Sequence, residues 1–302
     1  MKVGLTGIAA SAMLKLPFLE NGFRYFCSQE RLRKRLHLGA LAYGCVHCLN
    51  APEIRMAVLD NYKMYVNIAE PIGIQSYFFH INPFAWLAST LISSGDVCID
   101  VGANMGHYTF LMASIVGSSG KVISFEPQPY YFSLIQDSIK LNDLHNTIVE
   151  NKALWDESGK KLNFYLSENP NNSGTSSLIN HGLYLNEKRS LEVETITIFD
   201  YIEDHNIEKI NLIKIDVERA EFQVLQGMRT LLLKNSVDFL IVETCAHGLS
   251  HELLKQLGYR CFYIDERNKN IIDTQKIDEG FFGDYLFVSP QKSLHSLANF
   301  VN

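Results

Sequence analysis

The fold is decided by one stretch in the first half of the chain, Ile99-Asp100-Val101-Gly102-Ala103-Asn104-Met105-Gly106. An apolar run ends in an acid, and two glycines four residues apart then open a helix-like segment. α/β proteins build sites for nucleotide-sized ligands from this order of strand, glycine turn and helix. A dinucleotide fingerprint needs a glycine two residues after the first, and Asn104 occupies that position here. Because Asp100 would also repel a phosphate, the stretch favours a cationic ligand with an amine and a sulfonium, namely S-adenosylmethionine.

The bulk composition is that of an ordinary globular protein. Of 302 residues, 47% are hydrophobic and 20% are charged, which is enough to bury a full core. The formal net charge is −6, which gives no indication of the positively charged surface that binds nucleic acid, so nucleic acid is not the expected partner. Two of the six cysteines, Cys98 and Cys245, lie in apolar runs, which favours a reduced, cytoplasmic protein. We expect no stable membrane insertion, because no uncharged apolar run of about 18 residues occurs.

Two short motifs near the N-terminus have weaker functional interpretations. The segment Met1–Pro17 faintly resembles a signal peptide, but Lys15 interrupts it and export is not favoured. Cys45 and Cys48 enclose His47 in a C-x-x-C motif that would suit zinc, yet no second pair follows at finger-like spacing. We therefore predict no metal site.

Residues 1–92 are expected to form a helical and hairpin extension. Leu32 and Leu36 lie one helical turn apart in the basic stretch 31–41, which predicts an amphipathic helix. A solvated cationic face accounts for its charge better than an anchor for lipid or a partner. The extension is also a candidate surface for a homodimer. Its other expected elements are a hairpin over 56–60 and 63–67 and two apolar helices over 72–81 and 83–92.

Residues 93–302 are expected to form the main domain, in which strands and helices alternate. Such alternation predicts a parallel sheet with helices on both faces. The alternation breaks at about 155–198, which we interpret as an insertion on the substrate side, because long irregular segments in compact domains are usually functional. The expected strands are 97–101, 121–125, 147–149, 210–217, 238–242, 260–264 and 285–288, the last two as an antiparallel edge pair.

Polar residues follow the ends of these strands. Glu126 ends the second strand, where an acid accepts hydrogen bonds from both hydroxyls of a ribose, and Pro127 follows it. An acid preceding a helix is also explained by the helix dipole, and the two interpretations are compatible. Asn151 and Ala153 follow the third strand, where an adenine ring would lie, although an ordinary strand exit explains them nearly as well.

A second polar cluster, residues 214–221, ends the fourth strand. Alternation places Lys214, Asp216 and Glu218 on one side, and a buried lysine requires an acidic partner. Asp216 is our first choice for a functional role, binding either the amine of the ligand or a substrate hydroxyl. Glu218 or Glu221 is a candidate general base. The histidines that could fill that role are His107, His181 and His247.

The three motifs at 100–106, 125–127 and 213–218 together resemble the FkbM-type family of S-adenosylmethionine-dependent methyltransferases. The resemblance covers about residues 72–245. It implies a class I methyltransferase with a Rossmann-like, seven-stranded, mostly parallel sheet. It also implies that the first motif holds the methionine moiety and that Glu126 holds the ribose. Two departures stand out: Arg219 replaces a usual glycine, and Asn82 replaces an acid that often precedes Pro83.

The predicted function is O-methylation of a hydroxyl on a sugar or natural-product small molecule, as in natural-product biosynthesis. The alternatives are an inactive methyltransferase-like binding module and a methyltransferase acting on a peptide or RNA. A nicotinamide oxidoreductase is disfavoured by the missing middle glycine. The predicted cofactor-binding residues are Asp100, Gly102, Asn104, Gly106, Glu126, Pro127, Asn151, Ala153 and Asp216, and the candidate catalytic residues are Asp216, Glu218, His107 and His247.

Overall fold

The computed structural model describes residues 16–30, 42, 52–59, 61–169, 171–180 and 185–301. The expectations for the basic helix at 31–41, for Cys45, His47 and Cys48, for His181 and for almost all of the leader-like segment lie outside these residues. Within them, no helix combines the length and apolarity needed to cross a bilayer.

The N-terminal layer combines helices with a hairpin, as expected. Helix α2 (Pro17–Ser28) precedes the antiparallel pair β1 (Ile54–Leu59) and β2 (Tyr62–Asn67), which confirms the predicted hairpin. Helices α5 (Pro71–Phe79) and α6 (Ala85–Leu91) follow. Met64 and Phe78 of this layer are fully buried in one cluster with Phe110 and Ile135 of the main domain. Burial of such side chains contributes about 1.5–3 kcal/mol each, so this cluster joins the two parts firmly.

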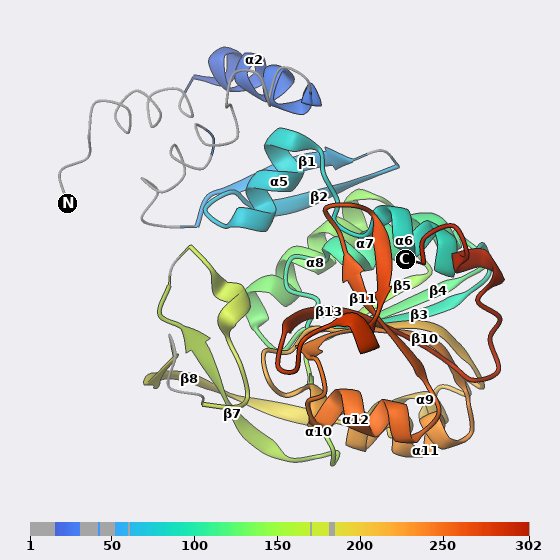
Figure 1. Cartoon of the computed structure of the whole chain (residues 1–302). Coiled ribbons are helices and arrows are strands. Elements are labelled where there is room, and N and C mark those ends of the chain that lie inside the picture. The colour runs from blue at the N-terminus through green and yellow to red at the C-terminus, as the bar shows by residue number, and fades with distance from the viewer. Residues whose placement is uncertain are drawn as a thin grey trace.

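The centre of the molecule is an eight-stranded sheet in the order β12-β11-β13-β10-β9-β3-β4-β5 (Figure 1). The run from β5 to β10 is parallel, whereas β13 is antiparallel to both its neighbours and β12 is antiparallel to β11. The strands are β3 (Val97–Val101), β4 (Lys121–Phe125), β5 (Thr147–Glu150), β9 (Ile210–Ile215), β10 (Val237–Cys245), β11 (Arg260–Asp265), β12 (Asn270–Asp273) and β13 (Phe282–Val288).

Helices cover both faces of this sheet because successive strand residues point in opposite directions. Ile99 packs with the helices on one face, while its neighbour Cys98 packs with those on the other. The first face carries α9 (Ile198–Asp204), α10 (Glu221–Gly227), α11 (Arg229–Leu233) and α12 (Leu249–Gln256). The second carries α6, α7 (His107–Val116) and α8 (Pro129–Leu141). The predicted α/β class is confirmed.

The sheet differs from the expectation at one edge. All seven expected strands are present, but β12 adds an eighth and forms the outer edge. The expected antiparallel pair, β11 and β13, therefore lies inside the sheet, with β13 between β10 and β11. After β9, residues 221–233 form two helices, α10 and α11, divided at Met228.

The inserted segment forms a second, three-stranded sheet in the order β6-β8-β7. Its strands are β6 (Ala153–Leu154), β7 (Lys161–Ser167) and β8 (Leu185–Ile196), and β8 is 12 residues long. Between β7 and β8, residues 173–175 form a 3-10 turn, η1. In Figure 1 this sheet lies beside the carboxyl ends of the central strands.

Candidate functional site

The turn after β3 is fixed by backbone contacts to both neighbouring strands. The N–H groups of Gly102 and Ala103 donate to the carbonyl of Phe125 in β4, and Asp216 N donates to Val101 O. Gly102 has φ 79, and a Cβ there would lie 1.9 Å from the carbonyl oxygen of Asp216. Only glycine fits both this left-handed conformation and this close approach.

The second glycine of the turn, Gly106, is required by a different contact. Gly106 has φ 88, and a Cβ there would lie 2.7 Å from the ring of Phe110. It ends the turn immediately before α7 and does not line the pocket described next. Asn104, between the two glycines, has φ 51, a conformation that asparagine tolerates better than most residues. Among the described residues, nothing donates a hydrogen bond to its buried Oδ1.

A pocket, called here the main pocket, lies at the carboxyl ends of β3, β4 and β9. Gly102, Asn104, Glu126 and Asp216 line its floor and sides. Ser173, Gly174, Ser176 and Leu178 of the inserted segment complete its lining. Residues 173–178 are called the cover below. Ligands in open α/β sheets bind at this edge, so the topology and the cavity agree.

Glu126 is a buried carboxylate whose two oxygens are both held. Oε2 accepts from Asn104 N at 2.7 Å and Oε1 from Gln128 N at 2.8 Å. Burial raises the pKa of Glu126 to about 8, and these two bonds only partly offset that effect. The bond to Gln128, at the start of α8, supports the helix-cap interpretation as well. Glu126 thus presents a carboxyl group with spare acceptor positions to the main pocket.

Asp100 does not line the main pocket, contrary to its expected role as a direct ligand. It is 2% exposed, and its Oδ2 accepts from Thr109 Oγ1 at 2.6 Å. Burial raises its pKa to about 6. The Thr109 hydroxyl also lies 2.7 Å from Ser124 Oγ. Asp100, Thr109 and Ser124 therefore form a buried polar cluster beneath the turn. Its position supports the turn from below.

The remaining residues that the sequence predicts for cofactor binding, Pro127, Asn151 and Ala153, are divided between two places. Pro127 and Ala153 line the main pocket, together with Leu154. Asn151 does not line it; its Nδ2 donates to the carbonyls of Glu126 and Pro127 at 2.9 and 3.0 Å. Asn151 therefore fixes the loop that carries Glu126.

Asp216 belongs to an ion-pair cluster around a buried lysine. Lys214 is 1% exposed, and its Nζ lies 3.3 Å from Asp216 and 2.9 Å from Asp284 of β13. The acidic partner that the sequence analysis required for a buried Lys214 is therefore present as two residues, Asp216 and Asp284. Two carboxylates around one ammonium keep Lys214 charged despite its burial, and its pKa is raised accordingly. Asp216 keeps 39% of its side chain exposed and lines the main pocket.

Glu218 lines a second hollow, called here the groove. The groove shares the segment 216–222 and the cover with the main pocket, and residues 244–250 form its opposite wall. Burial, reinforced by repulsion from Asp216 and Glu221, raises the pKa of Glu218 to about 7. Glu243 adds a third carboxylate within 4.8 Å of those of Asp216 and Glu218. Three acids so close keep one of them readily protonated near neutral pH.

Arg219 lies on the wall of the same groove and has φ 79. This left-handed conformation costs a non-glycine residue about 1–3 kcal/mol, which explains why glycine suits this position. The other departure, Asn82, donates from Nδ2 to the Tyr62 hydroxyl and to the carbonyl of His107. Asn82 is thus a structural bridge between β2 and α7.

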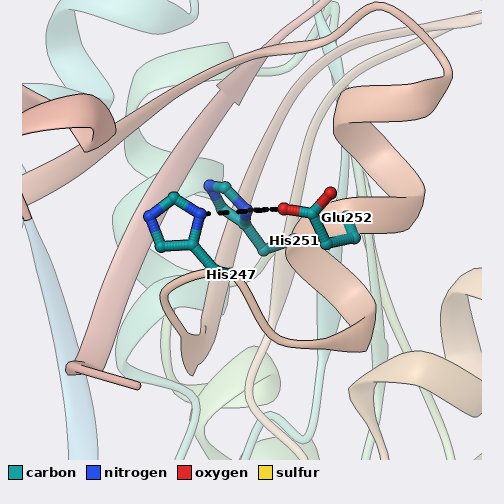
Figure 2. Close-up of side chains that lie close together, drawn as sticks. All are labelled: His247, His251 and Glu252. Atoms are coloured by element: carbon teal, nitrogen blue, oxygen red, sulfur yellow. Dashed lines mark ion pairs between the residues drawn. The ribbon is translucent and has the colours of Figure 1, made fainter. Parts of the chain in front are cut away.

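Neither histidine that the sequence favours as a base lines the main pocket or the groove. His107 is 6% exposed, its Nε2 lies 2.8 Å from Ser76 Oγ, and burial lowers its pKa to about 4. His247 faces His251 and Glu252 instead (Figure 2). The expectation that either is a base at the pocket is not met, because each side chain has partners on α5 or α12.

A residue that the sequence analysis missed, Glu70, connects the N-terminal layer to the cover. It is 2% exposed, and its Oε2 accepts from Ser173 N at 3.1 Å and from Ser173 Oγ at 2.7 Å. Oε1 accepts from Asn67 Nδ2 at 3.0 Å and from the hydroxyl of Tyr131, which lines the main pocket. The two residues are separated by 103 positions in the sequence, so short-range sequence patterns do not reveal this contact.

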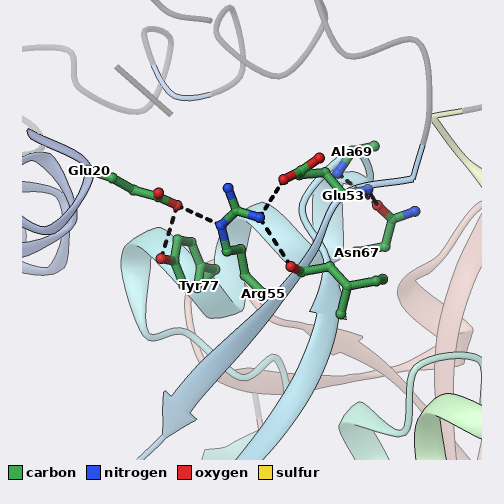
Figure 3. Close-up of polar contacts among 7 residues, drawn as sticks. Glu20, Glu53, Arg55, Asn67, Ala69 and Tyr77 are labelled. Atoms are coloured by element: carbon green, nitrogen blue, oxygen red, sulfur yellow. Dashed lines mark hydrogen bonds and ion pairs between the residues drawn. The ribbon is translucent and has the colours of Figure 1, made fainter. Parts of the chain in front are cut away.

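The polar network behind Glu70 is shown in Figure 3. Asn67 Oδ1 accepts from the N–H groups of Glu53 and Ala69 at 2.9 and 3.1 Å. Arg55 pairs with Glu53 and with Glu20 of α2, and Glu20 in turn accepts from the Tyr77 hydroxyl at 3.0 Å. The network ties α2, the hairpin and α5 together, and it holds Glu70 in place through Asn67.

Comparison with known proteins places these motifs in a family. A family model described as "Methyltransferase FkbM domain" matches residues 100–261. "Methyltransferase 1" of Beauveria bassiana is 26% identical over 206 residues, 63% of this chain and 81% of that protein. "Hexuronic acid methyltransferase AglP" of Haloferax volcanii is 30% identical over 148 residues, covering 49% and 55%. "31-O-demethyl-FK506 methyltransferase FkbM" of Streptomyces tacrolimicus is 28% identical over 160 residues, covering 44% and 60%. The chain thus spans little more than half of the last two relatives.

Proposed function

Because this chain belongs to the FkbM family of S-adenosylmethionine-dependent methyltransferases, we propose that it methylates a hydroxyl oxygen of a small molecule, such as a sugar or a natural product. The names of two relatives give a hexuronic acid and 31-O-demethyl-FK506 as what they methylate, which supports a small-molecule acceptor for this chain. The observation that carries the proposal is that the segment 216–222 contributes Asp216 to the lining of the main pocket and Glu218, two residues later, to the lining of the groove.

The residues of the main pocket fit S-adenosylmethionine. Asn104 Oδ1 has no hydrogen-bond donor among the described residues, and the carboxyl group of Glu126 faces the same pocket with acceptor positions to spare. We assign Glu126 to the ribose hydroxyls and Asp216 to the amine or the acceptor hydroxyl. Leu154, Phe164 and Leu178 supply an apolar wall suited to an aromatic ring.

The chemistry requires little from the protein beyond placement and a base. The cofactor supplies a methyl group on a positively charged sulfur, open to attack by oxygen. The groove would orient the acceptor hydroxyl toward that methyl group, and good orientation is worth about 7–11 kcal/mol. As the new C–O bond forms and the C–S bond breaks, the hydroxyl proton passes to a carboxylate oxygen of Glu218. A base with a pKa near the working pH is the most effective.

The proposed function is tested by incubating the protein with methyl-labelled cofactor and a cell extract. We expect the label in a small molecule, as a methyl ether that survives mild alkali, whereas a methyl ester would be cleaved. Boiled protein and the Glu126→Ala variant are the controls. Label found only in protein or RNA, or none above the controls, contradicts the proposal and favours a peptide or RNA substrate or an inactive binding module.

Binding of the cofactor is expected to release protons near pH 7. Glu126 has a pKa of about 8 in the unliganded protein, and ribose hydroxyls that donate to it favour its charged form. The affinity should therefore rise with pH and level off above about pH 8. Calorimetry in buffers of different ionisation enthalpy measures the release.

The matched variants for this measurement are Glu126→Gln and Glu168→Gln. The first should abolish the proton release and weaken binding, whereas the second removes an exposed acid near the cover and should preserve both. If Glu126→Gln still releases protons as the wild type does, Glu126 does not contact the ribose.

Glu70→Gln is expected to weaken cofactor binding by about tenfold or more. The substitution keeps the shape but removes the charge that holds Ser173, and a hydrogen bond to a charged group contributes about 1.5–3 kcal/mol. The dissociation constant measured by calorimetry checks this. Glu208→Gln, which removes an exposed acid outside the pocket, the groove and the network around Glu70, is the control. Equal affinities for both variants would show that the cover does not depend on Glu70.

A further inference from the structure

Three side chains outside the main pocket and the groove converge on the loop between β10 and α12. His247, His251 and Glu252 each offer one ligand atom, and these atoms all lie within 4.8 Å of one another. Nδ1 of His247 lies 3.7 Å and Nδ1 of His251 lies 3.5 Å from the same oxygen, Oε1 of Glu252. Figure 2 shows both rings directed toward that carboxylate.

His251 is the unusual member of the cluster. Its side chain is 0% exposed, and neither ring nitrogen makes a hydrogen bond to any described residue. It packs edge-on against the rings of Tyr285 and Phe287 of β13, with centroids 6.2 and 5.8 Å away. An unsatisfied buried polar group costs about 1–3 kcal/mol, so such a group calls for a partner.

The backbone directs His247 toward this buried ring. His247 has φ 59, a left-handed conformation that costs a non-glycine residue about 1–3 kcal/mol. Gly248 N donates to Cys245 O at 3.1 Å, which closes a tight turn immediately before α12. The turn places His247 over the first turn of the helix, where His251 and Glu252 lie. The ring of His247 stands 4.9 Å from that of His251.

We propose that His247, His251 and Glu252 bind a zinc ion. Two imidazoles and one carboxylate are a ligand set that zinc uses in proteins, and three protein ligands leave a fourth position for water. Bonds of about 2.0–2.2 Å in a tetrahedral site separate neighbouring ligand atoms by about 3.3 Å. The separations of the two Nδ1 atoms from Glu252 Oε1, 3.7 and 3.5 Å, exceed this value by a few tenths of an ångström, and the ligand atoms of the two histidines lie within 4.8 Å of each other. Lys255 also approaches Glu252, at 3.9 Å, but this exposed pair contributes little and yields readily to a divalent cation.

The ion would fix one wall of the groove. Cys245, Gly248, Leu249 and Ser250 line the groove and lie on the same loop as the three ligands. A metal that joins the turn to the first turn of α12 would hold these residues in one arrangement. This inference does not depend on which acceptor the enzyme uses.

The test uses the full chain with Cys45→Ser and Cys48→Ser, which removes the C-x-x-C motif as a competing site. Metal-free protein is titrated with Co²⁺, and bound Co²⁺ is then displaced by Zn²⁺. We expect one ion per chain, with visible cobalt bands and no thiolate-to-cobalt charge-transfer band. His247→Ala and Glu252→Gln should each weaken Zn²⁺ binding by more than about 100-fold, because loss of outer-shell partners alone costs 10–100-fold.

The matched control is His145→Ala. His145 is an exposed histidine 3.3 Å from Asp143, so it tests whether any histidine beside a carboxylate binds the ion, and it should leave the affinity unchanged. Far-UV circular dichroism confirms that each variant is folded. His247 and Glu252 are partly exposed, so both substitutions are suited to this test. Failure to bind one ion per chain, or undiminished binding in either ligand variant, overturns the proposal.

Discussion

Glu218→Gln is expected to lower turnover by about 10²- to 10⁴-fold, the usual contribution of a general base. Gln keeps the shape of the side chain but cannot accept the hydroxyl proton. The pKa of Glu218 is raised to about 7 by burial and by the nearby acids, so the wild-type rate at saturating cofactor should rise with pH through about 7 and then level off. The variant should lack this rise. Initial rates measured between about pH 5.5 and about pH 9 test both expectations. The carboxyl group of Glu218 is mostly protonated at the lower limit and mostly ionised at the upper one.

Two further variants make the assignment of Glu218 specific. Glu208→Gln removes an exposed acid outside the pocket and the groove and should leave the pH profile unchanged. Glu221 is the other candidate base, but it is 6% exposed and its Oε1 accepts from Arg219 N at 2.9 Å. If Glu221→Gln removes the rise with pH and Glu218→Gln does not, the base is Glu221.

Gly102→Ala is expected to destabilise the fold by about 3 kcal/mol or more and to abolish cofactor binding. An added Cβ would lie 1.9 Å from the carbonyl oxygen of Asp216, so the ends of β3 and β9 would have to separate. Overpacking typically costs about 1–3 kcal/mol, and the left-handed conformation adds about 1 kcal/mol. Chemical denaturation measures the loss of stability, and calorimetry measures binding.

Gly280→Ala separates the two contributions to this loss. Gly280 has φ 76, close to the value of Gly102, but a Cβ there would meet nothing within 4 Å. This variant should therefore lose only the conformational part of the free energy and should bind the cofactor normally. Equal losses of stability in the two variants would mean that the left-handed conformation alone accounts for the loss and that the contact between residue 102 and the carbonyl of Asp216 contributes nothing.

The features that the sequence could predict are local or periodic. The order of strands and helices, the glycine turn and the hairpin follow from short-range patterns of apolar and turn residues. The position of Glu126 at the pocket follows from its place at the end of a strand. The acidic partners of Lys214 were required by burial alone, although the sequence could not identify Asp284 as one of them.

The features that the sequence could not predict depend on contacts that only the fold creates, whether the partner is near or far along the chain. Asp100 is an acid at a strand end like Glu126, but its Oδ2 accepts a hydrogen bond from the hydroxyl of Thr109 and the side chain is buried away from the pocket. His107 follows the glycine turn, yet Ser76 of α5 holds its ring. β12 has only four residues, and the first half of β8 is too polar to be recognised as a strand, so pairing with neighbours decides both.

The position of β13 shows that the folding unit extends beyond the residues that the family model matches. The match ends at residue 261, two residues into β11, whereas β13 lies between β10 and β11 and carries Asp284. A shortened protein ending at residue 261 would retain Glu126, Asp216 and Glu218. It would, however, expose the backbone edge of β10 and leave Lys214 with one counter-ion in place of two. Such a fragment would tend to aggregate through that edge, so the boundaries of a usable expression fragment must be taken from strand order.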